Sequence, residues 1–525
     1  MRDFERPGRS TVYASEGMCA TSHPLATLTA VQILQKGGNA MDAAIAGAVL
    51  LGFCEPQMTG IGGDCFVLYT RPGATDVQAL NGSGRAPQAA SAAALRANGH
   101  DVVPPYSPHA VTIPGAIDAF CDLSETEGKL GLDALLSPAI HYAEAGIPIA
   151  PRVALDLAAD TETLQGSAIH RYSKAGKPFE TGDLFRSTEQ ADVLRRIARH
   201  GRDAFYTGEV ADDMLAALRA RGGVHTAEDF TEARCTRAQP ISGRYRDFEI
   251  LEHPPNGQGA AAILLLNILK HFDLAGMDPL GPERAHIEAE ATKLAYDARN
   301  RIIADPDHTA RLAHLLAPET AASLAGLISP KTVGADPAKT TEAVHKETVY
   351  ITVVDRDRMV VSLIYSIFHG FGSGIASDKF GVLLHNRGAG FTLQENHPNE
   401  LSGGKRPMHT IIPGMLAEGD RVTVPFGVMG GQYQSCGHAR FITNLTDFGM
   451  DLQTALDAPR LFPEAGELRV ESGFPDETRQ ALKDLGHNVV APAEPIGGAQ
   501  AIRIRPDGVL EGASDPRKDG CALGY

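Results

Sequence analysis

The chain has 525 residues, of which 43% are hydrophobic and 21% charged, and 64 Asp and Glu against 48 Lys and Arg give a net charge of −16. The hydrophobic content excludes an intrinsically disordered protein, and the length is enough for about two to four domains or for one large α/β unit. The acidic balance argues against a nucleic-acid partner, because affinity for nucleic acid depends on neutralising many phosphates.

The N-terminal sequence has no apolar run typical of a signal peptide, and no segment reaches the roughly 18 uncharged apolar residues of a membrane-spanning helix. We therefore expect a soluble, cytoplasmic protein that acts on small molecules and has no membrane partner. The 7 cysteines are scattered and never stand in Cys-x-x-Cys spacing, which favours free thiols over disulfides or a thiolate zinc site.

The first half of the chain is rich in Ala and Leu and is predicted to be largely helical, with Gly and Pro separating the helices. The predicted helices are Pro24–Lys36, Asn39–Gly52, Leu132–Ala145, Thr188–His200, Gly208–Ala220, Gly259–Phe272 and Pro282–Ala304. Residues Ser329–Glu347 then lack a clear period and are rich in Lys, Thr, Ala and Pro, which indicates an exposed connector.

After this connector the pattern changes to short β-branched runs separated by turns. The predicted strands are Thr348–Asp355, Met359–Phe368, Phe380–His385, His409–Leu416 and Arg421–Met429, and two more flank the turn at Arg505–Gly508. Helices are expected again at Ala439–Phe448, Asp451–Ala458 and Asp476–Leu485. Several strands are apolar at successive positions, as in strands covered on both faces, so helices on both faces of a sheet fit this order.

General catalytic motifs are missing from the sequence. It has no His-Glu-x-x-His, no Gly-x-Ser-x-Gly and no Walker lysine, and the loop Gly60–Gly63 lacks the strand and helix register of a dinucleotide site. We therefore predict neither a metal nor a cofactor. Composition and periodicity alone predict a soluble α/β enzyme of unspecified chemistry.

Seven short motifs nevertheless follow one another along nearly the whole chain: Gly37–Ile45, Glu55–Gly63, Thr348–Asp355, Phe371–Gly374, Gly404–Pro407, Met429–Gly431 and Asp515–Gly520. Together, in this order, they resemble the γ-glutamyltranspeptidase family of N-terminal nucleophile hydrolases. Each motif is weak alone, but seven in order make the resemblance strong.

The resemblance implies a four-layer αββα sandwich, an α/β fold, and a precursor that cuts itself between Glu347 and Thr348. Residues 1–347 are then the large subunit and residues 348–525 the small subunit. The two cleavage products are expected to form a heterodimer in which they intertwine as one domain. Whether this heterodimer dimerises further is left open. Cleavage would give Thr348 a free α-amine, whose reference pKa of about 7.7–8.0 suits it to accept the proton of the hydroxyl.

Attack on an amide produces a tetrahedral oxyanion, which needs hydrogen-bond donors that are already in place. The resemblance implies that these donors are backbone N–H groups at Gly430 and Gly431. It also places at Ser366 a hydroxyl that hydrogen-bonds the nucleophile Thr348.

Other positions depart from the glutamyl-transferring members of the family. Ser83 stands where those members have an Arg that holds the substrate α-carboxylate, and Gly390 replaces the acidic residue that holds the α-amino group. Phe368 replaces an Asn near the nucleophile, and His409 and Thr410 replace a pair of serines. Nothing in this set is suited to a free glutamyl head.

The predicted substrate-binding residues are instead Phe368, Arg387, His409 and Thr410, with Arg85 nearby in the early loop. The guanidinium of Arg387 suits a carboxylate, because it can form two parallel charge-assisted hydrogen bonds with it. The pattern is most similar to the oxamate amidohydrolase branch, so our main hypothesis is a threonine amidohydrolase acting on a small carboxylated amide through an acyl-enzyme.

Three alternatives stay open from the sequence. The chain could be a γ-glutamyl hydrolase or transpeptidase that recognises glutathione-like compounds through other residues, or a glutaryl-type acylase acting on larger amides. It could also be an inactive relative that only binds ligands, although the retained Thr348, Ser366 and Gly430–Gly431 disfavour this.

Overall fold

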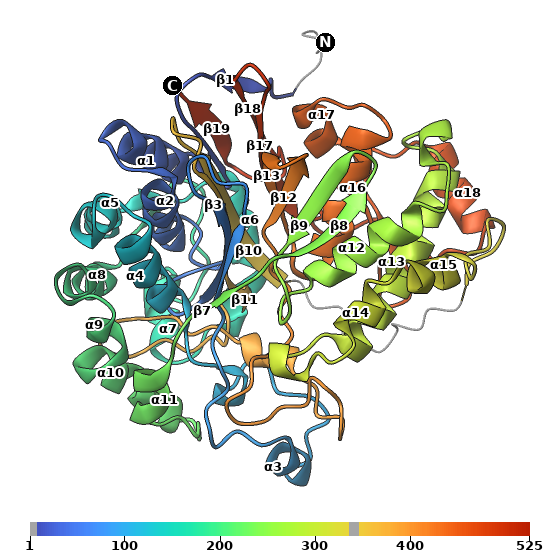
Figure 1. The fold of residues 1–525 in the computed structure, drawn as a ribbon. Helices are drawn as coiled ribbons and strands as arrows, with labels where there is room; N and C mark the ends of the chain where they lie inside the picture. The colour runs from blue at the N-terminus through green and yellow to red at the C-terminus, as the bar shows by residue number, and fades with distance from the viewer. Residues whose placement is uncertain (1–7, 335–345) are drawn as a thin grey trace.

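In the computed structural model, which describes residues 8–334 and 346–525, two seven-stranded antiparallel sheets lie face to face (Figure 1). The first has the order β1 (Val12–Ala14), β18 (Leu510–Ser514), β17 (Gly498–Ile504), β13 (Arg421–Met429), β12 (Gly414–Glu418), β9 (Phe248–Glu252) and β8 (Ile241–Tyr245). The second has the order β19 (Cys521–Gly524), β2 (Met18–Thr21), β10 (Lys346–Val354), β11 (Val360–His369), β3 (Asp64–Thr70), β4 (Gln78–Gly82) and β7 (Thr236–Ala238).

Helices cover the outer face of each sheet (Figure 1). Beside the second sheet lie α1 (Pro24–Gln35), α2 (Ala40–Cys54), α4 (Ala116–Thr126), α5 (Leu132–Ala145), α8 (Thr188–His200), α9 (Asp203–Tyr206), α10 (Gly208–Arg219) and α11 (Ala227–Glu232). Beside the first lie α12 (Gly259–Leu269), α13 (Pro282–Ile302), α14 (Leu312–Leu315), α15 (Pro318–Ala325), α16 (Gln434–Thr446), α17 (Leu452–Asp457) and α18 (Asp476–Asp484). The predicted αββα sandwich is confirmed.

Smaller elements complete the chain. The remaining helices are α3 (Ala92–Ala97), α6 (Pro151–Asp160) and α7 (Ser167–Tyr172), and two small sheets join β14 (Leu461–Glu464), β15 (Glu467–Val470) and β16 (Val489–Val490), and β5 (Ile147–Pro148) and β6 (Leu184–Phe185). Both large sheets interleave strands from before and after residue 348: in the second, β10 pairs with β2 on one side and β11 on the other.

The helix α2 illustrates how the sequence fixes these layers. Asn39 caps it by accepting from the backbone N–H of Asp42 at 3.0 Å, and the Asp42 carboxylate accepts from the N–H of Asn39 at 3.1 Å. This reciprocal capping box starts the helix. Because α2 is buried on nearly all sides, its sequence is apolar around the whole circumference and belongs to the largest hydrophobic core.

Most predicted elements agree with the structure, and α5, α8 and β13 have the predicted bounds. The predicted helix Ala439–Phe448 begins earlier, as α16. Residues 335–345 of the predicted connector lie outside the described residues; those from 330 to 334 are mostly exposed, as expected.

Two predicted strands are wrong in whole or in part. Phe380–His385 forms no strand beyond an isolated bridge between Ala376 and Leu383, because its N–H groups bond to loops instead, that of His385 to the carbonyl of Gly62. This run is apolar because it is buried. Residues 409–413 are not a strand either: Pro413 has no N–H, and the preceding N–H groups bond to side chains and to a neighbouring loop.

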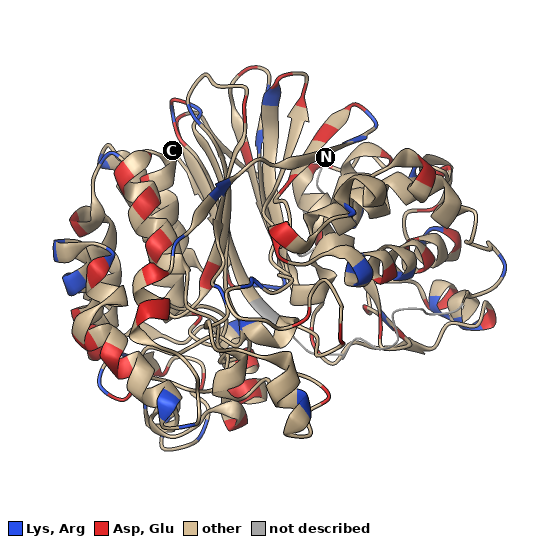
Figure 2. Ribbon diagram, turned by 60° about the horizontal axis from the view of Figure 1, so that its bottom comes forward, with Lys and Arg blue, Asp and Glu red and all other residues tan. Residues whose placement is uncertain are grey.

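Charged side chains lie mainly on the outer helices and loops, whereas the strands of the central sheets carry few (Figure 2). Among the described residues, no helix combines the length and the apolar character needed to cross a membrane.

Candidate active site

Thr348 lies near the start of β10, where an irregularity between residues 347 and 349 interrupts the pairing with β11. A bulge of this kind turns a side chain away from the regular alternation of the strand. The Thr348 side chain is buried, and its Oγ1 lies 3.5 Å from the Oγ of Ser366 and 3.5 Å from the Nε2 of Gln434. Two polar groups from different elements thus face the predicted nucleophile.

Ser366, on the neighbouring strand β11, links Thr348 to a buried arginine. Its Oγ accepts a hydrogen bond from Nη2 of Arg387 at 3.2 Å, and Nη1 of Arg387 donates to Oγ1 of Thr410 at 2.9 Å. The structure therefore brings four of the predicted residues into one hydrogen-bonded row. Arg387 is 0% exposed, and within residues 8–334 and 346–525 its Nε has no hydrogen-bond partner.

Phe368 forms one side of this arrangement. Its ring centroid lies 3.9 Å from Cζ of Arg387, which is cation–π distance, and its N–H donates to Oγ of Ser366 at 2.9 Å. Phe368 has φ of +83°, a conformation that bulky residues rarely adopt. Backbone strain of this kind is tolerated where the surrounding structure fixes a functional geometry. The backbone conformation of Phe368, together with packing, therefore holds its ring against the guanidinium of Arg387.

The charge of Arg387 is balanced by Asp64, at the start of β3 and opposite Ser366 in the sheet register. Burial lowers the pKa of the Arg387 guanidinium to about 9, and Asp64 opposes this shift. Burial alone would raise the pKa of Asp64, but His385, His409 and Arg387 together hold it below its ordinary value. Asp64 is therefore a fully buried carboxylate that interacts electrostatically with the fully buried Arg387.

Two imidazoles complete the surroundings of Asp64. Its Oδ2 lies 3.3 Å from Nε2 of His409 and 3.4 Å from Nδ1 of His385. Burial, reinforced by Arg387, lowers the pKa of His409 to about 3, so His409 is neutral at physiological pH. The predicted His409 thus contacts Asp64 rather than the row from Thr348 to Thr410.

The turn at Gly430 and Gly431 follows β13, and both residues have positive φ, +108° and +55°. A buried amide holds this turn: Nε2 of Gln258 donates to the carbonyl of Gly431 at 3.1 Å and to that of Thr410 at 2.6 Å. Oε1 of Gln258 accepts in turn from the buried Arg299. Gln258 thereby fixes the position of the turn at Gly430 and Gly431 relative to the hydrogen-bonded row that contains Arg387 and Thr410.

Arg85 stands apart from these residues. Its guanidinium donates to the carbonyl of Gly404 at 2.8 Å and lies 3.3 Å from Oδ2 of Asp305, with 42% of the side chain exposed. Its role in substrate binding stays a prediction. Ser83, where an arginine clamp is missing, is buried and accepts from the side chain of Asn256 at 3.0 Å.

A family model described as Gamma-glutamyltranspeptidase matches residues 26–525. The chain belongs to the γ-glutamyltranspeptidase family. It is thus an enzyme of the N-terminal nucleophile hydrolase type, as its sequence predicted.

Relatives of this γ-glutamyltranspeptidase-family enzyme carry different activity names. The glutathione hydrolase-like YwrD proenzyme of Bacillus subtilis is 35% identical over 98% of this chain and 99% of its own, and the oxamate amidohydrolase proenzyme of Klebsiella pneumoniae is 32% identical over 98% and 100%. A cephalosporin acylase from Bacillus halodurans has a crystal structure with a TM-score of 0.92 and 38% identity, covering 100% of this chain and 99% of that one. The fold is shared, whereas the substrate differs among them.

Sequence reasoning missed Asp64, His385 and Gln434 in this γ-glutamyltranspeptidase-family site. Asp64 directly follows the glycine-rich motif and His385 lies two residues before Arg387, so both stood beside residues already singled out. Nothing local in the sequence indicates that they meet, because their contacts join segments between 86 and 345 residues apart.

Replacing Asp64 by Asn tests the buried charge pair in this γ-glutamyltranspeptidase-family enzyme. An Asn can keep the bonds that Oδ1 accepts from the N–H groups of Gly84 and Gly115, while the side facing the imidazoles loses its charge. We expect the free energy of unfolding to fall by about 1.5–3 kcal/mol, the contribution of a hydrogen bond to a charged group, because the contact with His409 loses its charge and the buried Arg387 loses the negative charge that opposes its pKa shift. Denaturant titration measures this.

The dependence of stability on pH provides a second test of the charge on Asp64. Because the native pKa of Asp64 is depressed, its stabilisation is fully present above about pH 4 and is lost as the pH falls further, so the deficit of Asp64→Asn should shrink in acid. Asp357→Asn, which removes an exposed partner of Lys129, is the control and should cost about 0–1 kcal/mol. Equal effects of the two substitutions would contradict this reading of Asp64.

Proposed function

We propose that this protein is a self-processing threonine amidohydrolase that hydrolyses the amide of a short carboxylated substrate, with oxamate as the candidate. The observation that carries the proposal is the buried Arg387, whose Nε has no hydrogen-bond partner among the described residues and whose Nη2 binds the same hydroxyl that Thr348 contacts. An unpaired N–H on a buried cation is costly, and a substrate carboxylate would satisfy it.

The spacing limits the length of the substrate. Arg387 and Thr348 are connected through one hydroxyl, that of Ser366, by contacts of 3.2 Å and 3.5 Å. A carboxylate bound by Arg387 therefore lies close to a carbonyl carbon within reach of Oγ1 of Thr348. An acid whose carboxylate is bonded directly to the amide carbon fits this spacing, whereas the three carbons between carboxylate and amide of a γ-glutamyl group do not.

The nucleophile depends on cleavage between Glu347 and Thr348, which would give a large subunit ending at Glu347 and a small subunit starting at Thr348. The new α-amine would take the proton of the Thr348 hydroxyl as Oγ1 attacks the substrate carbonyl. N–H groups at Gly430 and Gly431 would stabilise the oxyanion. Names of relatives that include the word proenzyme support this processing and the resulting heterodimer.

The reaction then runs in two balanced steps. Collapse of the first tetrahedral adduct breaks the C–N bond, and the α-ammonium gives its proton to the departing amide nitrogen, which leaves as ammonia. Water, deprotonated by the same amine, attacks the acyl–Thr348 ester, and the ester oxygen recovers a proton as the free acid leaves. One water is consumed for each amide, with oxamate giving oxalate and ammonia.

A second candidate is an acylase acting on larger amides. A cavity of about 410 Å³ lies beside Gly430 and is lined in part by Tyr433, Phe462 and Arg469, which is more space than a two-carbon acid fills. The likeness to the cephalosporin acylase supports the same candidate. A γ-glutamyl hydrolase is a third, supported by the name of the YwrD relative.

Replacing Arg387 by Lys tests the proposed function. A lysine keeps the charge but cannot offer two parallel donors, so the KM for oxamate-like acids should rise by about tenfold or more, the effect of one lost charge-assisted hydrogen bond. Processing at Thr348 should be unchanged. Ammonia release from oxamate, malonamic acid and succinamic acid measures the effect and the preferred length.

The substrate preference of the wild-type enzyme distinguishes the three candidate functions. Glutathione and γ-glutamyl anilides should be poor substrates, because Ser83 and Gly390 offer no charged anchor. Efficient glutathione hydrolysis would promote the γ-glutamyl alternative, and turnover of bulky amides alone would promote the acylase. Wild-type kinetics of Arg387→Lys on short acids would remove Arg387 from substrate binding.

A further inference from the structure

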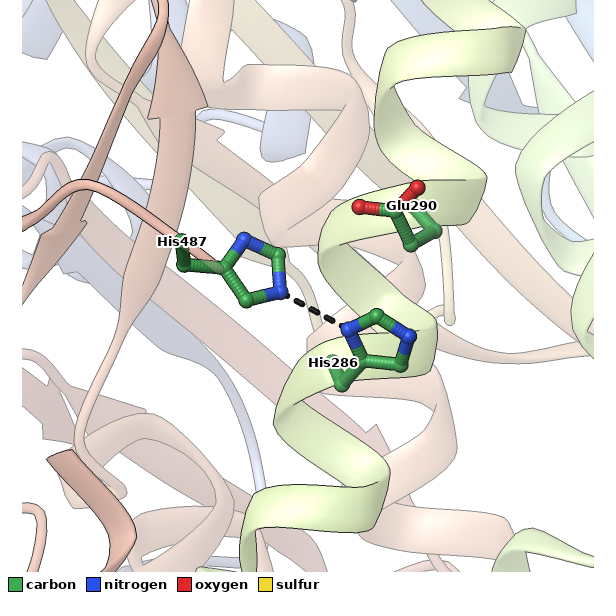
Figure 3. A group of neighbouring side chains, drawn as sticks. All are labelled: His286, Glu290 and His487. Atoms are coloured by element: carbon green, nitrogen blue, oxygen red, sulfur yellow. Dashed lines mark hydrogen bonds between the residues drawn. The ribbon is translucent and has the colours of Figure 1, made fainter. Parts of the chain in front are cut away.

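A second cluster of reactive side chains lies on the helical layer beside the first sheet (Figure 3). His286 and Glu290 occupy neighbouring turns of α13, and His487 comes from the segment after α18. One ligand atom of each lies within 4.8 Å of the others, and the residues are 1%, 4% and 9% exposed. Among the described residues this is the one group of three such side chains that meet so closely.

The hydrogen bonds of His286 fix its protonation. Its Nε2 lies 2.7 Å from the carbonyl oxygen of Ser329, which can only accept, so Nε2 carries the proton. Its Nδ1 is then an unprotonated lone pair, 2.8 Å from Nε2 of His487 (Figure 3). A ring nitrogen bonded to a backbone carbonyl, with the other free to coordinate, is the usual arrangement of a metal-binding histidine.

We propose that His286, Glu290 and His487 bind a divalent transition-metal ion through Nδ1, a carboxylate oxygen and Nε2. Two imidazoles with one carboxylate are a donor set typical of Zn²⁺ and of neighbouring first-row metals. The proton that now bridges the imidazoles would move to Nδ1 of His487, so both rings coordinate in their neutral form. Burial, with His286 and Lys293 adding to it, lowers the pKa of His487 to about 4, which keeps this ring neutral at physiological pH.

Lys293 is the competitor of such an ion. Its Nζ lies 2.6 Å from Oε1 of Glu290 and 3.2 Å from the carbonyl oxygen of Gly334, and Oε2 of Glu290 accepts from the N–H of Gly334. The ammonium thus supplies the positive charge that balances Glu290 without a metal. A bound ion would displace Nζ from Oε1 and leave it the carbonyl of Gly334, so removing the ammonium should strengthen metal binding.

The position points to a structural role. The three residues are separate from the row that joins Thr348 to Arg387, and they connect α13, which precedes residue 348, with a segment that follows it. Ser329 and Gly334 hold the start of the connector against the same cluster. An ion here would cross-link the two parts of the chain and the base of the segment between them.

Zinc binding to the full-length protein tests the proposal. After incubation with ZnCl₂ and gel filtration, the wild type should retain one Zn²⁺ per chain, and Co²⁺ should give the visible absorption of a protein-bound, non-octahedral ion. Glu290→Gln, which keeps the side-chain volume, and His487→Asn, which removes the imidazole, should each abolish both signals. His271→Ala, at an exposed histidine, is the control and should bind as the wild type does.

Lys293→Met separates a metal site from a purely hydrogen-bonded cluster. If the ammonium competes, this variant should bind Zn²⁺ about tenfold more tightly or better, the effect of one lost charge-assisted bond. Circular dichroism of each variant confirms folding. Absence of Zn²⁺ from the wild type, whether or not Lys293→Met binds it, would overturn the proposal, and so would retention that Glu290→Gln and His487→Asn leave unchanged.

Discussion

Replacing Thr348 by Ala is expected to leave one full-length chain without detectable amidase activity. The same Oγ1 would attack first the carbonyl of Glu347 and later the substrate, so its loss removes both reactions. Denaturing electrophoresis shows processing as two bands, and ammonia release shows turnover. Thr348→Ser keeps a hydroxyl and should retain part of both activities.

Thr352→Ala is the matched control for this experiment. Thr352 lies on the same strand and is equally buried, but its hydroxyl donates to the carbonyl of Val361 and not to the site. This variant should be processed and active. Normal processing of Thr348→Ala would show that another residue is the nucleophile, and an intact wild-type chain with no activity would favour a ligand-binding relative.

Replacing Gly431 by Val should lower kcat by about 10²–10³, the usual effect of losing one oxyanion donor. A β-branched side chain at φ of +55° disturbs the turn and reduces access of the substrate carbonyl to the backbone N–H groups. Steady-state kinetics on the processed enzyme measures the loss. KM should change less than kcat, because the donor acts mainly on the charge of the transition state.

Gly419→Val separates backbone strain from catalysis. Gly419 has φ of +59°, close to that of Gly431, but lies in an exposed turn where an added Cβ meets nothing within 4 Å. This variant carries a similar conformational cost and should keep wild-type kcat. An unchanged kcat in a soluble, processed Gly431→Val protein would place the oxyanion donors elsewhere.

The sequence predicted those parts of the fold that depend on local signals. Helices α5 and α8 have the predicted bounds, because an apolar stripe bounded by Gly or by turn residues is visible within a dozen residues. Residues 409–413 look like the start of a strand, but their N–H groups are used by Asn256 and by the side chains of His409 and Gln434. Such long-range partners leave no local periodicity.

The candidate site likewise contains residues that motifs in the sequence indicate and residues that only long-range contacts bring there. Ser366, Arg387 and Thr410 were singled out because motifs fixed their order, and the structure joins them in one row. The sequence does not indicate Asp64, although its charge opposes that of Arg387, since a carboxylate after a glycine turn has no distinctive spacing. Arg85 is predicted beside these residues because it lies in the early loop, whereas its contacts in the structure are with Asp305 and Gly404.

Because each large sheet contains strands from both sides of residue 348, a cut at this residue would determine whether the unfolded molecule can refold. While the chain is continuous, β2, β10 and β11 reach one another by an intramolecular search. After the cut, neither fragment could rebuild a sheet without strands of the other, and lone strands would expose unpaired edges that promote aggregation. Refolding would then require two fragments to meet, each prone to aggregate. The lifetime of the mature enzyme would consequently be set by its slow rate of unfolding rather than by a reversible folding equilibrium. A molecule that has unfolded would not recover its native structure.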